Sequence, residues 1–133
     1  MENSQIQDQP SIKVLDQPII QNEPGQSEVI IAYVTVPNQE IAEKLGGLLV
    51  EKQLVACANI IPGLTSIYKW KGQIEKDSEL LMMLKTKRSL FQELVNEVKA
   101  NHPYECPEII SVGDVQQAYK PYYDWILKET KNT

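Results

Sequence analysis

The stretch VACANIIPGLTSIYKWKGQIEKDSELLMMLKTK, residues 55–87, decides the fold. Strand-forming residues lie on both sides of Lys71-Gly72-Gln73, a sequence typical of a chain reversal. The pattern predicts a β-hairpin with an arm of about fourteen residues, or roughly 46 Å at 3.3 Å per residue. Pro62-Gly63 interrupts the first arm and could divide it into two short strands.

This predicted hairpin is longer than the helices that could cover it. A helix of about fourteen residues spans only about 21 Å. We therefore expect open strand edges and uncovered apolar side chains, among them Ile60, Ile61, Leu64 and Ile67. This surplus of apolar surface predicts an obligate oligomer.

A strand and a helix are expected before the hairpin. Residues 29–36 are apolar and rich in β-branched side chains, which predicts a central strand buried on both faces. Asn38 is placed to cap a helix whose apolar residues recur at one-face helical spacing. Those apolar residues are Ile41, Leu45, Leu48 and Leu49.

The same order repeats after the hairpin. We expect a helix from Ser89 to about Asn101, a strand over 108–115 and a terminal helix over 119–130. The order β-α-β-β-α-β-α predicts an α+β fold: a ferredoxin-like sandwich with a C-terminal helix and an extended hairpin between the second and third strands. Both crossover helices should lie on one face of a four-stranded antiparallel sheet.

Composition divides the chain into two parts. Residues 1–27 are crowded with Gln, Asn, Asp, Glu and Pro, which predicts a disordered polar N-terminal extension before a domain over 28–133. A sparse apolar cluster between Pro10 and Pro24 could be a docking motif, a strand-like arm or a linker.

Charge and cysteine content restrict the partners and the compartment. A formal net charge of −5 argues against nucleic acid, whose binders need clustered Lys and Arg. No apolar run is long enough for a signal peptide or a membrane span, and the two cysteines form no Cys-x-x-Cys pair. We therefore expect a cytoplasmic protein without nucleic acid or membrane partners.

The loop HPYECPE, residues 102–108, is the densest candidate for chemistry. Imidazole and thiolate are donors for Cu or Zn, so His102 with Cys106 or Cys57 could hold such an ion weakly. A Cys-His nucleophile pair, or Glu105 with Glu108 as paired carboxylates, would be the enzymatic interpretation. Nothing nearby orients the imidazole or supplies an oxyanion site, so we expect no enzyme.

Four aromatic residues suggest a ligand cleft. Tyr68, Trp70, Tyr104 and Trp125 each combine a large apolar face with a polar group. They could line a cleft, or they could pack the sheet against the last helix or a neighbouring subunit. A cleft between subunits would use both properties.

Several ordered motifs resemble the CutA divalent-cation tolerance family, and the resemblance covers the chain from residue 28 onward. They are Tyr33–Asn38, Glu51–Gly63, Thr65–Gly72, Leu84–Thr86, His102–Glu105 and Tyr122–Trp125. The resemblance implies a ferredoxin-like subunit in a tight homotrimer, similar to the PII signalling proteins, with clefts between subunits. It implies no reaction and no required cofactor.

The resemblance also bears on metal binding. Copper ligands in bacterial members are a cysteine in the first strand and a His-His pair before Pro-Tyr. The matching positions are Val34, Asn101 and His102, so one strong donor of three remains.

Three functions stay open. The first is a metal-binding tolerance protein that uses His102 with Cys57 or Cys106. The second is a PII-like trimeric carrier or sensor whose inter-subunit cleft binds a small molecule or an ion. That cleft would lie near Tyr68, Trp70, Lys85, His102, Tyr104, Glu105 and Trp125. The third is a scaffold that displays its N-terminal arms.

Overall fold

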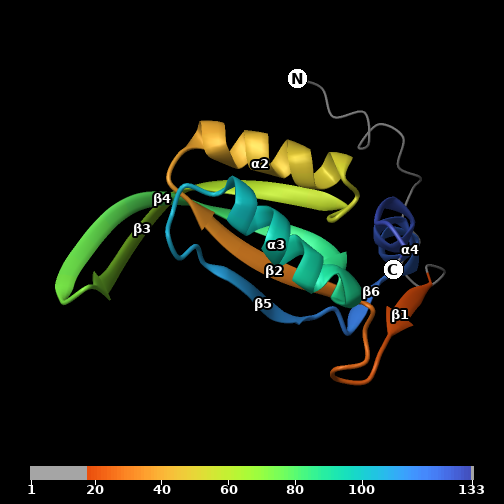
Figure 1. Ribbon diagram of the computed structural model, residues 1–133. Coiled ribbons are helices and arrows are strands. Elements are labelled where there is room, and N and C mark those ends of the chain that lie inside the picture. The colour runs from red at the N-terminus through yellow and green to blue at the C-terminus, as the bar shows by residue number, and fades with distance from the viewer. Residues whose placement is uncertain (1–17, 133) are drawn as a thin grey trace.

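A four-stranded antiparallel sheet of order β3-β4-β2-β5 forms the centre of the computed structural model, which describes residues 18–132. Its strands are β2 (Val29–Val36), β3 (Cys57–Trp70), β4 (Gln73–Lys87) and β5 (Ile109–Asp114). Helix α2 (Gln39–Glu51) follows β2, and the turn η2 (Arg88–Leu90) with helix α3 (Phe91–Asn101) follows β4. Both helices lie on one face of the sheet (Figure 1), as the ferredoxin-like prediction requires.

The core lies between that face and the two helices. Strand β2 is central, paired with β4 on one side and β5 on the other, and most of its side chains are buried as predicted. The Asn38 side chain accepts a hydrogen bond of 2.9 Å from the Ile41 backbone N–H, which confirms the predicted helix cap. The core side chains include Ala32, Val34, Val36, Ala42, Leu45, Leu49, Met82, Leu84, Leu94 and Val98.

The β3–β4 hairpin extends past both helices. Helix α2 has 13 residues and β4 has 15, so the helix spans roughly 20 Å and the strand roughly 50 Å. Figure 1 shows the distal hairpin projecting beyond α2 and α3. Ile61 is 41% exposed and Ile67 is 68% exposed, as predicted, whereas Ile60 packs against the core. The reversal at Lys71-Gly72 has two positive φ angles, 50° and 82°, as a two-residue hairpin turn requires.

A β-bulge, and not a break into two strands, lies at Pro62-Gly63, so the predicted arm of about fourteen residues is confirmed. Ile61 pairs with Leu81 and Leu64 pairs with Glu79, so β3 contains one residue more than β4 between these pairs. Gly63 provides the positive φ of 86° within the bulge. The strand continues, but its side-chain alternation shifts by one residue, which places Leu64, Tyr68 and Trp70 on the same face as Glu79.

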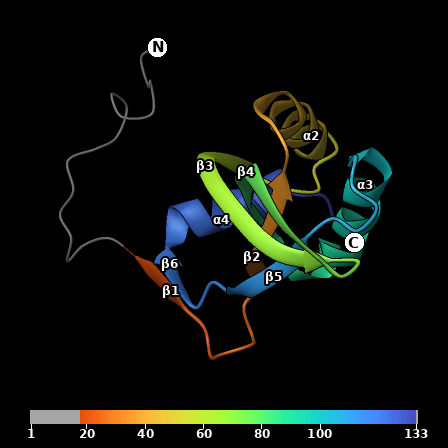
Figure 2. The same ribbon diagram turned by 90° about the vertical axis from the view of Figure 1, so that its left-hand side faces the viewer.

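The second face of the sheet carries an apolar surface that α2 and α3 do not cover. Strand alternation and register place Ile31, Tyr33, Ile61, Leu81, Met83 and Ile110 on it. We call these six residues the bare face. Helix α4 (Lys120–Glu129) covers only one end, where Tyr123 and Ile126 pack on Val29 and Ala56. Figure 2 shows α4 on the side opposite α2 and α3.

A second small sheet was not predicted. Strand β1 (Ile19–Gln21) pairs antiparallel with β6 (Gln117–Tyr119). Ile20 packs against the apolar cluster that Tyr123 and Ile126 of α4 form with Val29 and Ala56. The predicted disordered extension over 1–27 therefore differs from the structure at Ile19–Gln21, where an apolar pair finds a partner strand distant in sequence. Residues 1–17 lie outside the described residues.

Asp114 fixes the connection between β1 and β2. Its Oδ2 accepts hydrogen bonds from the backbone N–H groups of Gly25 (2.9 Å) and Ser27 (3.4 Å). The Arg88 Nη2 atom lies 3.7 Å from the same oxygen. Desolvation opposes ionisation of this carboxyl, but the backbone hydrogen bonds and the Arg88 charge outweigh it, so the pKa of Asp114 lies below its ordinary value. The segment before β2 is thereby tied to β5.

Candidate functional site

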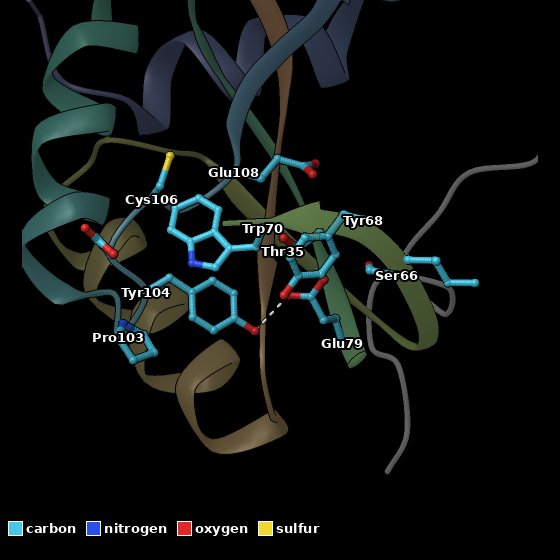
Figure 3. Close-up of a pocket in the computed structure, with 11 residues that line it drawn as sticks. Thr35, Ser66, Tyr68, Trp70, Glu79, Pro103, Tyr104, Cys106 and Glu108 are labelled. Carbon is cyan, nitrogen blue, oxygen red and sulfur yellow. Dashed lines mark hydrogen bonds between the residues drawn. The ribbon is translucent and has the colours of Figure 1, made fainter. Parts of the chain in front are cut away.

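A pocket of about 660 Å³ opens between the distal hairpin and the loop after α3. The bulge in β3 is what turns Tyr68 and Trp70 toward it. Three aromatic residues and three glutamates stand out in its lining: Tyr68, Trp70, Tyr104, Glu79, Glu105 and Glu108 (Figure 3). A second hollow, of about 770 Å³, lies between α2 and α3, and the only ring among the described residues that line it, apart from Pro103, is the imidazole of His102.

Glu79 is the buried charge of this pocket. It is 6% exposed, and its Oε2 accepts a hydrogen bond of 2.8 Å from the Tyr104 hydroxyl (Figure 3). Within residues 18–132, no Lys, Arg or His side chain forms an ion pair with it. Because an uncompensated buried carboxylate is costly, the pocket favours a positively charged occupant.

The two tyrosines of the pocket are held as hydrogen-bond donors. Burial and the hydrogen bond to Glu79 raise the pKa of Tyr104. The Tyr68 hydroxyl donates a hydrogen bond to Asp77, and this hydrogen bond, with the surrounding carboxylates, raises the pKa of Tyr68 to about 12. Both hydroxyls therefore stay protonated at neutral pH and cannot act as bases there.

His102 lies behind the pocket and positions its loop. Its Nε2 donates to the Thr35 carbonyl at 2.8 Å, and its Nδ1 accepts from the Tyr104 backbone N–H at 3.1 Å. A carbonyl can only accept and an amide N–H can only donate, so the ring is the neutral Nε2–H tautomer. Both nitrogens are occupied, and the imidazole anchors Tyr104.

The remaining residues of the predicted cleft fall into two groups. Tyr68, Trp70, Tyr104 and Glu105 line the pocket. Lys85 lies near the other end of β4, where it donates a hydrogen bond of 3.1 Å to the Tyr122 hydroxyl. The Trp125 ring stacks on Tyr122 with a centroid distance of 5.4 Å. One chain alone does not bring the two groups together.

The three metal-ligand candidates also lie in different settings. Cys57 begins β3 and donates to Asn59 Oδ1 at 3.5 Å, Cys106 is exposed in the pocket loop, and His102 is buried. In the part of the chain that the structure describes, no group of three or more His, Cys, Asp or Glu side chains is arranged to hold a metal ion.

Sequence reasoning missed Glu79. It lies in the polar run EKDSE of β4, where its side chain could face either way. The only signal was Pro62-Gly63, because a bulge there decides which β4 side chains share a face with Tyr68.

Comparison with known proteins identifies the family. A family model described as "CutA1 divalent ion tolerance protein" matches residues 30–129. The chain belongs to this CutA1 family. Human "Protein CutA" is 47% identical over 104 residues, which are 78% of this chain and 58% of the human protein. The Thermus thermophilus "Divalent-cation tolerance protein CutA" is 43% identical over 100 residues, 75% of this chain and 96% of that protein.

Solved CutA1 structures share the fold. The CutA1 structure from Oryza sativa has a TM-score of 0.77 at 38% identity, covering 80% of this chain and 97% of the rice chain. The Thermus thermophilus structure has a TM-score of 0.74 at 42% identity, covering 77% and 99%. The chain spans little more than half the length of the human and mouse relatives.

For this CutA1 family member we predict that His102→Ala lowers the free energy of unfolding by about 2 kcal/mol, because the Thr35 carbonyl and the Tyr104 N–H lose their partner. Urea unfolding should show this loss, with Lys99→Ala on the exposed side of α3 as the control. Equal stability of the two variants would mean that the imidazole has no anchoring role.

Proposed function

We propose that this chain is a non-enzymatic binding protein that assembles as a homotrimer, takes part in divalent-ion tolerance and holds a cationic ligand in the pocket beside Glu79. The observation that carries the proposal is the buried Glu79 carboxylate, which meets a neutral hydroxyl and no basic side chain within residues 18–132. The names of the relatives, which refer to divalent-ion and divalent-cation tolerance, agree with a cationic ligand.

The bare face supports assembly. Ile110, on the edge strand β5, is 46% exposed and lies beside Tyr33 in the register of β2 and β5. A contiguous apolar surface on one sheet face is typical of a subunit interface. We propose that two further copies of the chain cover it, as the family resemblance implies.

Binding fits this pocket better than catalysis. The tyrosine hydroxyls are protonated at neutral pH, and His102 uses both nitrogens to hold its loop. What remains is a negative, aromatic-lined cavity that attracts a cation. Direct coordination of Cu or Zn would need donors from a neighbouring subunit in addition to Cys106 and the glutamates.

The second candidate is a PII-like small-molecule carrier or signalling protein. The aromatic lining of Tyr68, Trp70 and Tyr104 favours an organic ligand over a bare ion. In a trimer, Lys85 and Trp125 of a neighbouring copy could approach the pocket and complete an inter-subunit cleft.

None of the helices within residues 18–132 is long and apolar enough to cross a bilayer. Relatives include an Arabidopsis thaliana protein named chloroplastic and an Archaeoglobus fulgidus protein described as periplasmic. We propose a cytoplasmic location from the cysteine content of this chain.

If the chain assembles through the bare face, a charged side chain introduced there should dissociate the assembly. The wild-type chain of 15.1 kDa should form a particle of about 45 kDa, and Ile110→Glu should dissociate it because a carboxylate would be buried without a partner. Light scattering after size-exclusion chromatography measures both masses. The control is Val50→Glu, which alters a residue of similar exposure on α2, outside the bare face. A wild-type monomer, or equal effects of both variants, would refute the interface.

The cation site predicts saturable binding of Zn²⁺ or Cu²⁺ in calorimetry, weakened about tenfold by Glu79→Gln because one buried negative charge is lost. The matched control is Glu28→Gln, an exposed carboxylate at the opposite end of the sheet. Heats that are the same for wild type and Glu79→Gln would place metal binding elsewhere on the protein.

A further inference from the structure

The pocket already has an ammonium group at its rim. The Lys71 side chain comes from the hairpin turn, and its Nζ lies 3.5 Å from Glu105 Oε2. The same nitrogen lies 5.7 Å from the centroid of the Trp70 ring. Trp70 and Glu105 both line the pocket, so the protein's own lysine shows which chemical group this rim accepts.

A ring face beside a carboxylate is a specific environment for an organic cation. The ring attracts an ammonium group through its negative face, and the carboxylate adds a charged hydrogen bond. A metal ion instead requires several donor atoms at fixed short distances. The described residues contain no such donor group, whereas they do contain the ring and the carboxylate.

The pocket offers two negative positions at different depths. The Glu105 side chain at the rim is 73% exposed, whereas Glu79 at the pocket wall is only 6% exposed. The volume of about 660 Å³ leaves room for an alkyl chain between them. The rings of Tyr68, Trp70 and Tyr104 provide apolar walls for that chain (Figure 3).

We infer that the pocket binds an organic ammonium ion of the alkyl-diamine class, one ammonium group at Glu79 and the other at the Trp70–Glu105 rim, where it displaces Lys71. The inference rests on the proposed function, because it takes this pocket as the ligand site. It adds the chemical class of the ligand and a role for Lys71 as an intramolecular competitor.

Lys71 is suited to be displaced. Its side chain is 70% exposed and its carboxylate partner is 73% exposed, and ion pairs this exposed contribute little to stability. A ligand that also reaches Glu79 gains a second charged contact that Lys71, at the rim, does not make. Removal of the lysine should therefore strengthen ligand binding, which no merely structural role of Lys71 would produce.

The test uses the full-length assembled protein with both of its tryptophans in place. Putrescine is titrated in calorimetry, with neutral 1,4-butanediol and Zn²⁺ as comparison ligands. Putrescine should saturate and butanediol should not. Lys71→Ala should tighten putrescine binding about two- to fivefold, and Glu79→Gln should weaken it about tenfold.

Lys69→Ala is the matched control. It removes the same charge from a residue of β3 two positions before Lys71, but its side chain alternates to the face opposite Tyr68 and Trp70. It should leave the putrescine affinity unchanged. Equal tightening in Lys69→Ala and Lys71→Ala would reduce the effect to net charge and overturn the competitor role.

The outcomes separate the inference from the proposed function. Zn²⁺ binding that depends on Glu79, without putrescine binding, would overturn the diamine class and leave the cation site standing. Putrescine binding that is strengthened by Lys71→Ala supports the inference whether or not Zn²⁺ binds. Absence of binding by both would refute the pocket as a cation site and the inference with it.

Discussion

The structure depends on a mismatch of length between its helices and its longest hairpin. A helix rises about 1.5 Å per residue and a strand about 3.3 Å, so α2, with 13 residues, cannot cover β4, with 15. The hairpin therefore continues past the core into solvent. Its free part provides one wall of the pocket and, next to the core, part of the bare face. Both features come from one constraint of chain geometry.

The bulge at Pro62-Gly63 decides how that free part is used. Without the extra residue, strict alternation along β3 would place Tyr68 and Trp70 on the face opposite Glu79. With it, aromatic rings and carboxylates share a face, and the His102 loop closes the pocket by carrying Tyr104 to Glu79. The pocket is thus assembled from three segments that lie far apart in the sequence.

The sequence predicted the fold well because its long elements are strongly patterned. The apolar run of β2, the helical spacing of Ile41 and Leu45, and the turn at Lys71-Gly72 each specify local structure. For the segment that contains β1, the sequence left a strand-like arm open beside a docking motif and a linker, because three residues carry too little periodicity and the partner β6 lies almost a hundred residues away.

The site was harder to predict than the fold. Tyr68, Trp70, Tyr104 and Glu105 line one pocket. Lys85, placed by the register of β4, and Trp125, on α4, lie at the other end of the sheet, which a sequence does not show. His102 was considered a metal donor because a sequence does not show which partners its nitrogens have. Those partners are backbone groups of Thr35 and Tyr104, and they exist only after folding.

The central claim is that the bare face is covered in the native protein by other copies of the chain. Hydroxyl-radical footprinting with mass spectrometry measures this directly through the oxidation rates of Met83 and Tyr33. The neighbouring core residue Met82, which is fully buried, and Tyr119, which is 46% exposed, set the two ends of the scale. The account predicts that Met83 and Tyr33 are protected nearly as well as Met82. Oxidation of both at a rate close to that of Tyr119 would contradict it.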